Sequence, residues 1–465
     1  MQPGMFIGAQ TMTTNVRNLL ILLIASTVVA APLAVAAPQP VGGGPNASTA
    51  APVPGKGSNQ PPSVTAFPRP GEGPIFPVTE ALEAMRSGHP QLSAARADIR
   101  AAAADAVAAG LWSNPQLDAS YLRAVTTNPS VDSALGFAAA GYTQFLETAG
   151  APKARREAAQ WTHDAVQSDS QALERQLSVA VQRACQHLVA AATRVEVHRQ
   201  SVNRLQFADG VVGARVRDGA APQFDGSRMT IAIALARSML GEAEADVIAA
   251  KGELRIAVGN PDYQVHGLPA LDLYLSETPV AAERLVEETH SNRPDLQAAR
   301  QREHAAQTQV SVAKKSILPG FGLRGGVQYG NSSGELDFTV GITVPLLVND
   351  HGQGTIAAAV ARSESAHEQM RSLDVQAEQR VRAAWDEVQR RNDAFAKFRD
   401  SGATSAQNMG DQAMAGYRGG KVSVLELVDA FTAKRDAQLR LVDLAESMQD
   451  AALRLRQAVQ AGGSN

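Results

Sequence analysis

Ser87-Gly-His-Pro90-Gln-Leu-Ser-Ala-Ala-Arg96 occurs a second time in this sequence, as Ser291-Asn-Arg-Pro294-Asp-Leu-Gln-Ala-Ala-Arg300, 204 residues further on. The same offset places Pro115 on Pro319, where the helical pattern of each occurrence stops. A gapless match over about thirty residues that ends at the same helix breaker is hard to obtain from composition alone. The chain is therefore predicted to contain two copies of one unit.

The composition favours close-packed helices and argues against a charge-driven partner. The 465 residues include 43 Lys plus Arg and 46 Asp plus Glu, so the net charge of -3 gives no global field that would gather nucleic acid or anionic lipid. Hydrophobic residues make up 44% of the chain but aromatic residues only 5%, so the apolar content is mostly Ala, Val and Leu. Such residues suit helices that pack closely on one another.

The sequence predicts neither a disulfide nor a metal or cofactor site. The single cysteine, Cys185, lies in a helical run and is interpreted as a small packing residue. The nine histidines are scattered, and none stands at the spacing that places two ligands on one helix face. Neither a phosphate loop nor a His-Glu-x-x-His motif occurs, and the chain is not expected to be an enzyme.

The N-terminal residues have the features of an export signal. Arg17 precedes an apolar run from Leu19 to Val29, and Ala34-Val35-Ala36 is a small-residue cleavage site, so residues 1–37 are predicted to be a signal peptide that starts at Met1 or Met12. The run is short for a membrane span, and a membrane anchor is the alternative. Residues 38–77 are rich in Pro, Gly, Ser and Ala, which predicts a disordered leader.

The first copy is predicted over residues 78–265. A helix is expected from its cap at Thr79 to Trp112. A strand follows at about 116–125, where apolar and polar residues alternate, and a second strand at 135–146, placed mainly by its counterpart in the second copy. Two long helices, over Lys153–Gln206 and Asp225–Val258, complete the copy, and a break at Asp218-Gly219-Ala-Ala-Pro222 separates them.

The second copy, predicted over residues 279–462, repeats this plan more clearly. A helix from Ala281 to Ile317 is followed by strands at about 320–330 and 335–345 around a short loop, and then by long helices over Gly354–Met409 and Val422–Gln460. The apolar side of its strands carries Leu323, Val327, Phe338 and Ile342, and the polar side carries Arg324, Gln328 and Thr339.

These strands have the length and alternation of strands that cross a bilayer. About ten residues suffice for a tilted transmembrane strand, although a strand of a soluble sandwich can show the same pattern. The export signal and the flanking helices of roughly 35 to 55 residues, or ~50 to 80 Å, favour the membrane. Four strands cannot close a barrel, and lipid forbids an open sheet edge. Of the closed arrangements, we prefer three chains, which predicts a 12-stranded β-barrel continued by an α-helical barrel.

Four sequence motifs lie where the predicted strands and helices of the two copies begin or end. They are Asn114-Pro115-Gln116-Leu117, Gln144-Phe-Leu-Glu147-Thr-Ala-Gly150-Ala-Pro-Lys153-Ala-Arg155, Val344-Pro345-Leu346 through Gly352-Gln-Gly354, and Tyr417-Arg-Gly-Gly420-Lys-Val-Ser-Val-Leu-Glu426-Leu-Val-Asp429-Ala430. In this order and with this duplication, the stretch from Val78 to Ala461 resembles the TolC-type outer membrane efflux proteins, and within them the heavy-metal, CzcC-like branch. Gly150-Ala-Pro-Lys153 departs from the Gly-Gly-Lys-Arg type of sequence usual in that branch.

The resemblance implies a mainly α-helical protein with a small membrane β part, assembled as a homotrimer in the cell outer membrane with a periplasmic helical extension. It would be the passive channel of a tripartite efflux system, in contact with outer-membrane lipid. An inner-membrane pump and a periplasmic adaptor would deliver small solutes to it, heavy-metal cations among them. The alternative is the outer-membrane duct of a type I protein or peptide secretion system.

Two functional classes without a membrane duct were also considered. An exported hydrolase would need a nucleophile–base constellation that the sequence does not offer. A soluble structural coiled coil would not need hairpins with one apolar and one polar face.

The last two long helices are separated by a break at Gly416-Tyr-Arg-Gly-Gly420, and the acidic residues after it are the candidate site. By resemblance, Glu426 and Asp429 match two acidic positions that ring the periplasmic aperture of the family, and Asp225 falls opposite Glu426 in the first copy. Three chains would bring these carboxylates near one axis and favour cations. The alternative is a pair of acids favoured by the helix dipole at a helix N-terminus. Arg228 could latch the closed tip, and Tyr417 and Arg418 are the further tip candidates.

Overall fold

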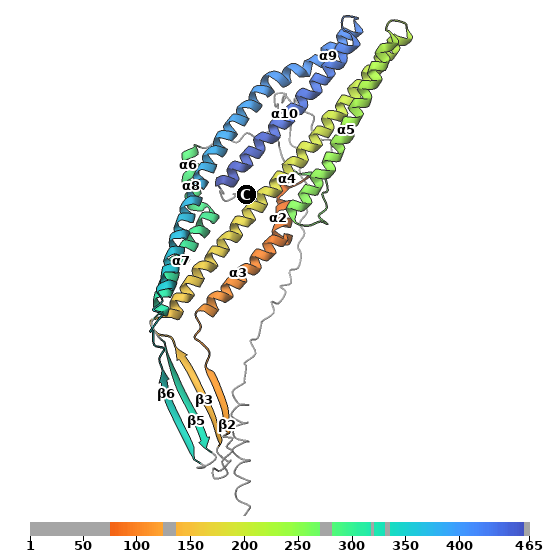
Figure 1. Ribbon diagram of the computed structural model, residues 1–465. Helices are drawn as coiled ribbons and strands as arrows, with labels where there is room; N and C mark the ends of the chain where they lie inside the picture. The colour runs from red at the N-terminus through yellow and green to blue at the C-terminus, as the bar shows by residue number, and fades with distance from the viewer. Residues whose placement is uncertain (1–74, 124–135, 270–280, 318–319, 331–334, 460–465) are drawn as a thin grey trace, which may run out of the picture. The chain divides into compact units, whose positions relative to one another are not determined.

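The computed structural model describes residues 75–123, 136–269, 281–317, 320–330 and 335–459, all within one unit of residues 64–465. The predicted signal peptide, most of the predicted leader and the loop 331–334 lie outside these ranges. The described chain is mainly helical and passes twice through short helices, a hairpin and long helices (Figure 1). The first pass comprises α2 (Val78–Gly88), α3 (Pro90–Ala109), β2 (Gln116–Arg123), β3 (Gly136–Leu146), α4 (Ala151–Arg217) and α5 (Gln223–Val258). The second comprises α6 (Ala282–Asn292), α7 (Pro294–Ser316), β5 (Phe321–Gly330), β6 (Leu336–Thr343), α8 (Gln353–Lys397), a π-helix (Phe398–Ala403), α9 (Thr404–Arg418) and α10 (Val424–Val459).

The four long strands form one antiparallel sheet in the order β2-β3-β5-β6. The two hairpins therefore join through β3 and β5, where Leu146 lies opposite Phe321 and Phe137 opposite Gly330. Among the described strands, β2 and β6 each pair with one neighbour only, so they form the two edges of the sheet.

The register of the sheet gathers apolar side chains on one face. Leu323 lies opposite Ile342 and Val327 opposite Phe338, and directly opposite residues of an antiparallel pair share a face. The same face carries Leu117, Ala119, Tyr121, Ala138, Ala140, Tyr142, Tyr329, Leu336 and Val340. The other face carries Arg324, Gln328 and Thr339, so the alternation in the sequence becomes a two-faced sheet.

The long helix α4 is the element on which the other helices are assembled. It contacts α3, α5, α7 and α10, and its 67 residues extend for ~100 Å at the usual helical rise. Many of its buried positions are small, such as Ala184, Ala190 and Ala191, which lets neighbouring helices approach closely. The buried apolar residues form several separate clusters along the helices rather than one centre. No helix in the described ranges is both long and apolar enough to cross a membrane.

Each pass begins with two helices where the sequence predicts one. The expected helix from Thr79 to Trp112 is divided into α2 and α3, and the expected helix from Ala281 to Ile317 is divided into α6 and α7. Pro90 and Pro294 explain both breaks, because a proline removes a backbone donor and disfavours the helical conformation of the residue before it. That residue is extended in both copies, with ψ of 124° and 115°. Pro77, rather than Thr79, precedes α2.

Two other helices extend further than the stretches predicted for them and end at the breaks that the sequence places at Asp218–Pro222 and Gly416–Gly420. α4 continues beyond the predicted end at Gln206 to Arg217. The helical stretch predicted to end at Met409 continues to Arg418, through the π-helix and α9. Both helices therefore reach the turns that precede α5 and α10.

Equivalent residues of the two copies close the ends of equivalent helices. His89 lies against Gly259, which ends α5 with φ of +76°, and a Cβ atom placed on that glycine would be 2.4 Å from the histidine ring. Arg293, 3% exposed, donates a hydrogen bond from Nη1 to the carbonyl oxygen of Ala458 in the last turn of α10 (2.8 Å). Its Nε and Nη2 bind the Asp295 carboxylate at 2.7 and 2.9 Å. The two short helix pairs are thus tied to the returning helices.

We expect Gly259→Ala to destabilise the protein by about 3 kcal/mol, because it adds a collision with the His89 ring to the strain of a positive φ. The matched control is Gly219→Ala, where φ is +69° but a Cβ would meet no atom within 4 Å, so about 1 kcal/mol is expected. Thermal unfolding followed by circular dichroism in detergent would compare them. In a His89→Ala background the difference between the two substitutions should shrink; an unchanged difference would contradict this account.

Candidate functional site at the helix tips

The turns that join α4 to α5 and α9 to α10 are packed together. An apolar cluster links them, with Val212 from α4, Met229 from α5, Tyr417 from α9, and Leu427 and Phe431 from α10. Met229 and Leu427 are fully buried. Both turns lie at the ends of the long helices that are distant along the chain from the hairpins. The sequence candidates of the two copies are therefore brought into one tip.

Tyr417 joins the two turns. Its side chain is buried, and its carbonyl oxygen accepts a hydrogen bond from Nη1 of Arg215 at the end of α4. The Arg215 guanidinium lies 4.9 Å from the centre of the Tyr417 ring, within cation–π range. The Tyr417 hydroxyl donates a long, weak hydrogen bond to Oδ2 of Asp225 (3.5 Å). Burial, reinforced by the Asp225 charge, raises the pKa of this hydroxyl, so it stays protonated.

The central residue of this contact, Arg215, was not among the sequence candidates. Its only local signal is its position in the last turn of a long helix, where basic residues are common because of the dipole. Its partner, Tyr417, is 202 residues away. Arg418, which the sequence did single out, lies instead with its guanidinium 5.6 Å from the Phe207 ring centre, beside a surface hollow of about 660 Å³.

Glu426 closes the N-terminus of α10 as a capping box with Ser423. Its Oε2 atom accepts hydrogen bonds from the Ser423 backbone amide (2.7 Å) and hydroxyl (2.9 Å), and its own amide donates to Ser423 Oγ (3.3 Å). These hydrogen bonds, the backbone one first, lower the pKa of the Glu426 carboxyl. Glu426 thus performs the helix-terminal role that was the alternative to an aperture.

Asp429 and Arg228 are not paired with each other. Asp429 is exposed on α10, three residues after Glu426, and makes no ion pair with any described residue. Arg228 is half-buried on α5, and its Nε atom is buried without a hydrogen-bond partner among the described residues. Of the sequence candidates, the chain therefore brings Asp225 and Tyr417 together and leaves Asp429 and Arg228 without a charged partner in the described ranges.

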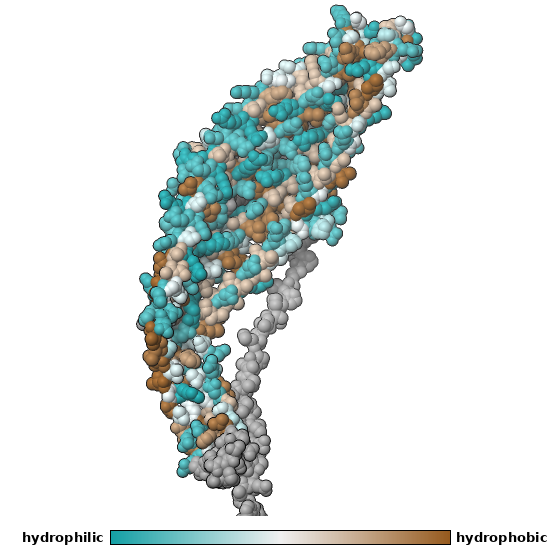
Figure 2. All heavy atoms as spheres, viewed as in Figure 1, coloured by the Kyte–Doolittle hydropathy of each residue, from teal (hydrophilic) through white to brown (hydrophobic). Residues whose placement is uncertain are grey.

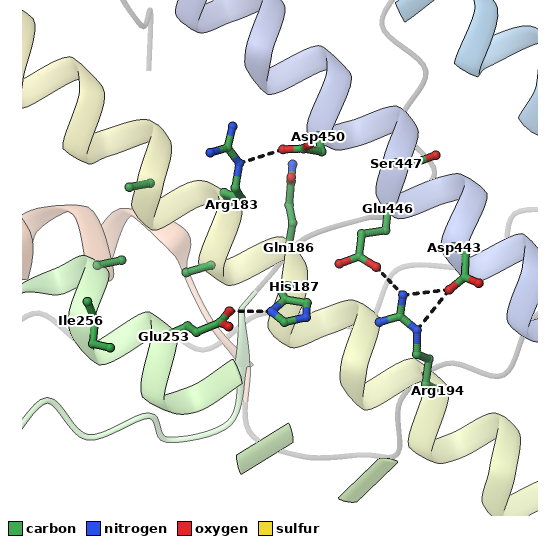
Figure 3. A pocket seen from close by; sticks show the side chains of 13 residues that line it. Arg183, Gln186, His187, Arg194, Glu253, Ile256, Asp443, Glu446, Ser447 and Asp450 are labelled. Carbon is green, nitrogen blue, oxygen red and sulfur yellow. Dashed lines mark hydrogen bonds and ion pairs between the residues drawn. The ribbon is translucent and has the colours of Figure 1, made fainter. Parts of the chain in front are cut away.

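A second cavity, of about 680 Å³, lies between α4, α5 and α10 (Figure 3). Two ion-paired arginines cross it, Arg183 with Asp450 (2.7 Å) and Arg194 with Asp443 (2.8 Å) and Glu446. The His187 ring is hydrogen-bonded through Nδ1 to Oε2 of Glu253 (2.7 Å). Because each of these side chains already has an oppositely charged or hydrogen-bonding partner, the cavity is a joint between helices rather than a reaction centre. No group of three or more His, Cys, Asp or Glu in the described ranges could hold a metal ion.

Comparisons with known proteins agree with the two-pass fold. The model of the outer membrane efflux protein family matches residues 81–260 and 285–460, so each matched segment covers one pass of the chain. The nickel-cobalt-cadmium resistance protein NccC of Alcaligenes xylosoxydans xylosoxydans is 26% identical over 306 residues, which cover 64% of this chain and 67% of NccC.

Solved structures share the fold at low sequence identity. CusC, described in terms of folding and transmembrane channel formation, has a TM-score of 0.68 and 18% identity, covering 87% of this chain and 99% of that one. The open state of the Neisseria gonorrhoeae outer membrane channel MtrE has a TM-score of 0.68 and 17% identity, covering 83% and 89%.

We expect Arg215→Met to loosen the tip, because it removes both the hydrogen bond to the Tyr417 carbonyl and the contact with its ring. A decrease of about 1.5 kcal/mol in the free energy of local opening corresponds to amide hydrogen exchange about tenfold faster in residues 404–423. The matched control is Arg418→Met, whose guanidinium lies over an exposed ring and should leave exchange nearly unchanged. Equal protection in the two variants would show that the apolar cluster alone holds the turns together.

Proposed function

Because the chain belongs to the outer membrane efflux protein family, whose members are channels and not enzymes, we propose that it is the outer-membrane channel of a tripartite efflux system. Three copies form the duct, a periplasmic adaptor and an inner-membrane pump deliver the solute, and the helices extend into the periplasm. The observation that carries this proposal is the four-stranded sheet, apolar on one face and polar on the other, with an edge on each side. Three such sheets supply the twelve strands of a closed barrel.

The orientation of the sheet follows from its faces. Leu323, Val327, Phe338 and Ile342 face lipid, and Phe338 and Ile342 are 77% and 68% exposed in the single chain. Arg324, Gln328 and Thr339 face the lumen. Arg324 extends over Gly141 toward Asp118, since a Cβ atom on that glycine would be 3.7 Å from Arg324 Nε and 3.9 Å from Asp118 Cβ. Opposite charges in the lumen wall suit a water-filled passage.

Heavy-metal cations are the proposed substrate class. The support is the relation to NccC, a nickel-cobalt-cadmium resistance protein, at 26% identity. Because the duct is passive, the pump selects the solute and the channel need only let cations pass. Carboxylates near the aperture favour such ions.

A deletion strain tests the function. Loss of the protein should raise sensitivity to nickel, cobalt and cadmium, and the unaltered chain should restore resistance. Phe338→Asp should fail to restore it, since a charge would face lipid and destabilise the barrel, whereas Thr339→Asp, one residue away on the polar face, should succeed. Unchanged metal resistance together with loss of a secreted protein would favour the secretion duct instead.

The aperture is proposed to be lined by Asp429, Glu426 and Asp225. Asp429 has the strongest support because its carboxylate is exposed and free of intrachain ion pairs in the described ranges, whereas Glu426 is held by Ser423 and Asp225 lies beside Tyr417. Arg228 is proposed as a latch to a carboxylate of a neighbouring protomer, which the unpartnered Nε atom supports. Tyr417 and Arg418 form the tip around this ring.

We expect Asp429→Asn to weaken block by a multivalent cation about tenfold in planar bilayers, when the cation is added on the side of the helix tips. Glu426→Gln should have a smaller effect, because its carboxylate is bound to its own helix end. Glu368→Gln, at an exposed acid of α8, is the control and should leave block unchanged. Parent-like block in Asp429→Asn would place the constriction elsewhere.

A further inference from the structure

The residues after the second strand are covered in the first hairpin and exposed in the second. Residues 144–148, at the end of β3 and just after it, are all half-buried. Residues 344–348, just after β6, are Val-Pro-Leu-Leu-Val and are all exposed, with Leu346 82% and Val348 73% accessible. Apolar residues gather where the sheet meets α8 (Figure 2). A fully apolar segment without cover needs an explanation.

The first hairpin shows what normally covers this segment. On one side, Gln144 Nε2 donates a hydrogen bond to the Ser113 carbonyl oxygen in the residues leading into β2 (2.9 Å). On the other side lie the residues leading into β5, where a Cβ atom placed on Gly320 would be 2.7 Å from the Leu146 carbonyl oxygen. The segment after β3 is thus enclosed by the entries of two strands, one from its own hairpin and one from the next.

The entry of β2 is the matching surface without cover. Val107, Leu111 and Trp112, at the end of α3 and just after it, are 63%, 62% and 53% exposed. Residues 113–115 are exposed as well. β2 and β6 are the two edges of the sheet, so these apolar residues lie at one edge and residues 344–348 at the other.

We propose that Val344–Val348 of one protomer packs against Leu111–Leu117 of the next, and that this seam, incomplete in a single chain, seals the base of the barrel. In this seam Leu346 faces Leu117, as Leu146 of the first hairpin faces Phe321. The inference rests on the proposed trimer and names the surfaces that close it. The entry of β5 receives the end of β3 from the preceding hairpin. No hairpin precedes the entry of β2 in the part of the chain that the structure describes, so we assign the preceding one to another copy.

A second copy fits these surfaces better than lipid does. Within residues 344–348 the Val348 N–H donates to the Leu346 carbonyl oxygen (3.1 Å). Lipid would cover the side chains but could not bond to the other backbone groups, whereas an extended segment of another chain can. The two surfaces are different and lie on opposite edges, so the contact is head to tail. Such contacts between identical chains generate a ring when the rotation closes.

Paired cysteines in the full-length protein test the seam. Leu117→Cys with Leu346→Cys should give covalent dimers and trimers on oxidation or with a short bismaleimide, because the equivalent residues Phe321 and Leu146 are paired and paired residues bring Cα atoms within disulfide reach. The native Cys185 stays silent, since burial raises the pKa of its thiol to about 12. The control pair is Leu117→Cys with Val375→Cys, an exposed position on α8, which should give no ladder.

The possible outcomes distinguish a failure of the proposed seam from a failure of the proposed function. A trimer of native mass without the Leu117–Leu346 ladder would overturn the seam and leave the proposed function standing. A parent protein that is a folded monomer in detergent and in membranes would overturn both. A fluorophore on Leu346→Cys that brominated lipid quenches as fully as one on Val340→Cys would make lipid the occupant and also overturn the seam. A fraction of trimer about tenfold lower in Leu346→Asp than in the parent, with no such decrease in Val375→Asp, would support the seam.

Discussion

A β-sheet placed in lipid must pair every backbone donor and acceptor, and this chain by itself offers only four strands. β2 and β6 each bond to one described strand, so each presents an outer row of N–H and C=O groups. An unsatisfied group in hydrocarbon costs several kcal/mol, and a row of them exceeds the whole stability of a typical domain. The proposed membrane location therefore requires other copies to pair the two edge strands, as the proposed trimer does. Water would tolerate the free edges, but it would not favour the exposed apolar face.

The hairpins could be predicted from sequence because burial on one face leaves a period of two in the residues. Leu323, Val327, Phe338 and Ile342 all follow it, and the register then places them together. The helix breaks at His89 and Arg293 were missed for a complementary reason. A proline suits the first turn of a new helix, so the helical periodicity resumes at once after Pro90 and Pro294, and the pattern resembles one continuous helix.

At the tip, too, one contact joins residues that are close in the sequence and another joins residues that are far apart. The capping box of Ser423 and Glu426 spans three residues, so its chemistry is present in the sequence, although it was weighed there only as a helix-terminal alternative. The contact between Arg215 and Tyr417 spans 202 residues and depends on how two helical hairpins meet. Long-range contacts of this kind leave no periodicity, and an arginine at a helix end has many possible partners. The fold was accessible from one sequence, but the principal tip contact was not.

The two copies differ most where their surroundings differ, and this asymmetry separates contacts made within a chain from those left for assembly. Arg215 and Asp225 of the first copy meet Tyr417 of the second inside one protomer, so these contacts form before any other chain is present. Arg228 and Asp429 stand near the same tip without intrachain ion pairs in the described ranges. In the proposed trimer, each protomer tip would move as one packed body, because its own contacts are satisfied. An opening motion would then change the distances between protomers first. Those distances determine how strongly the charged residues that are unpaired within one chain interact with the neighbouring protomers.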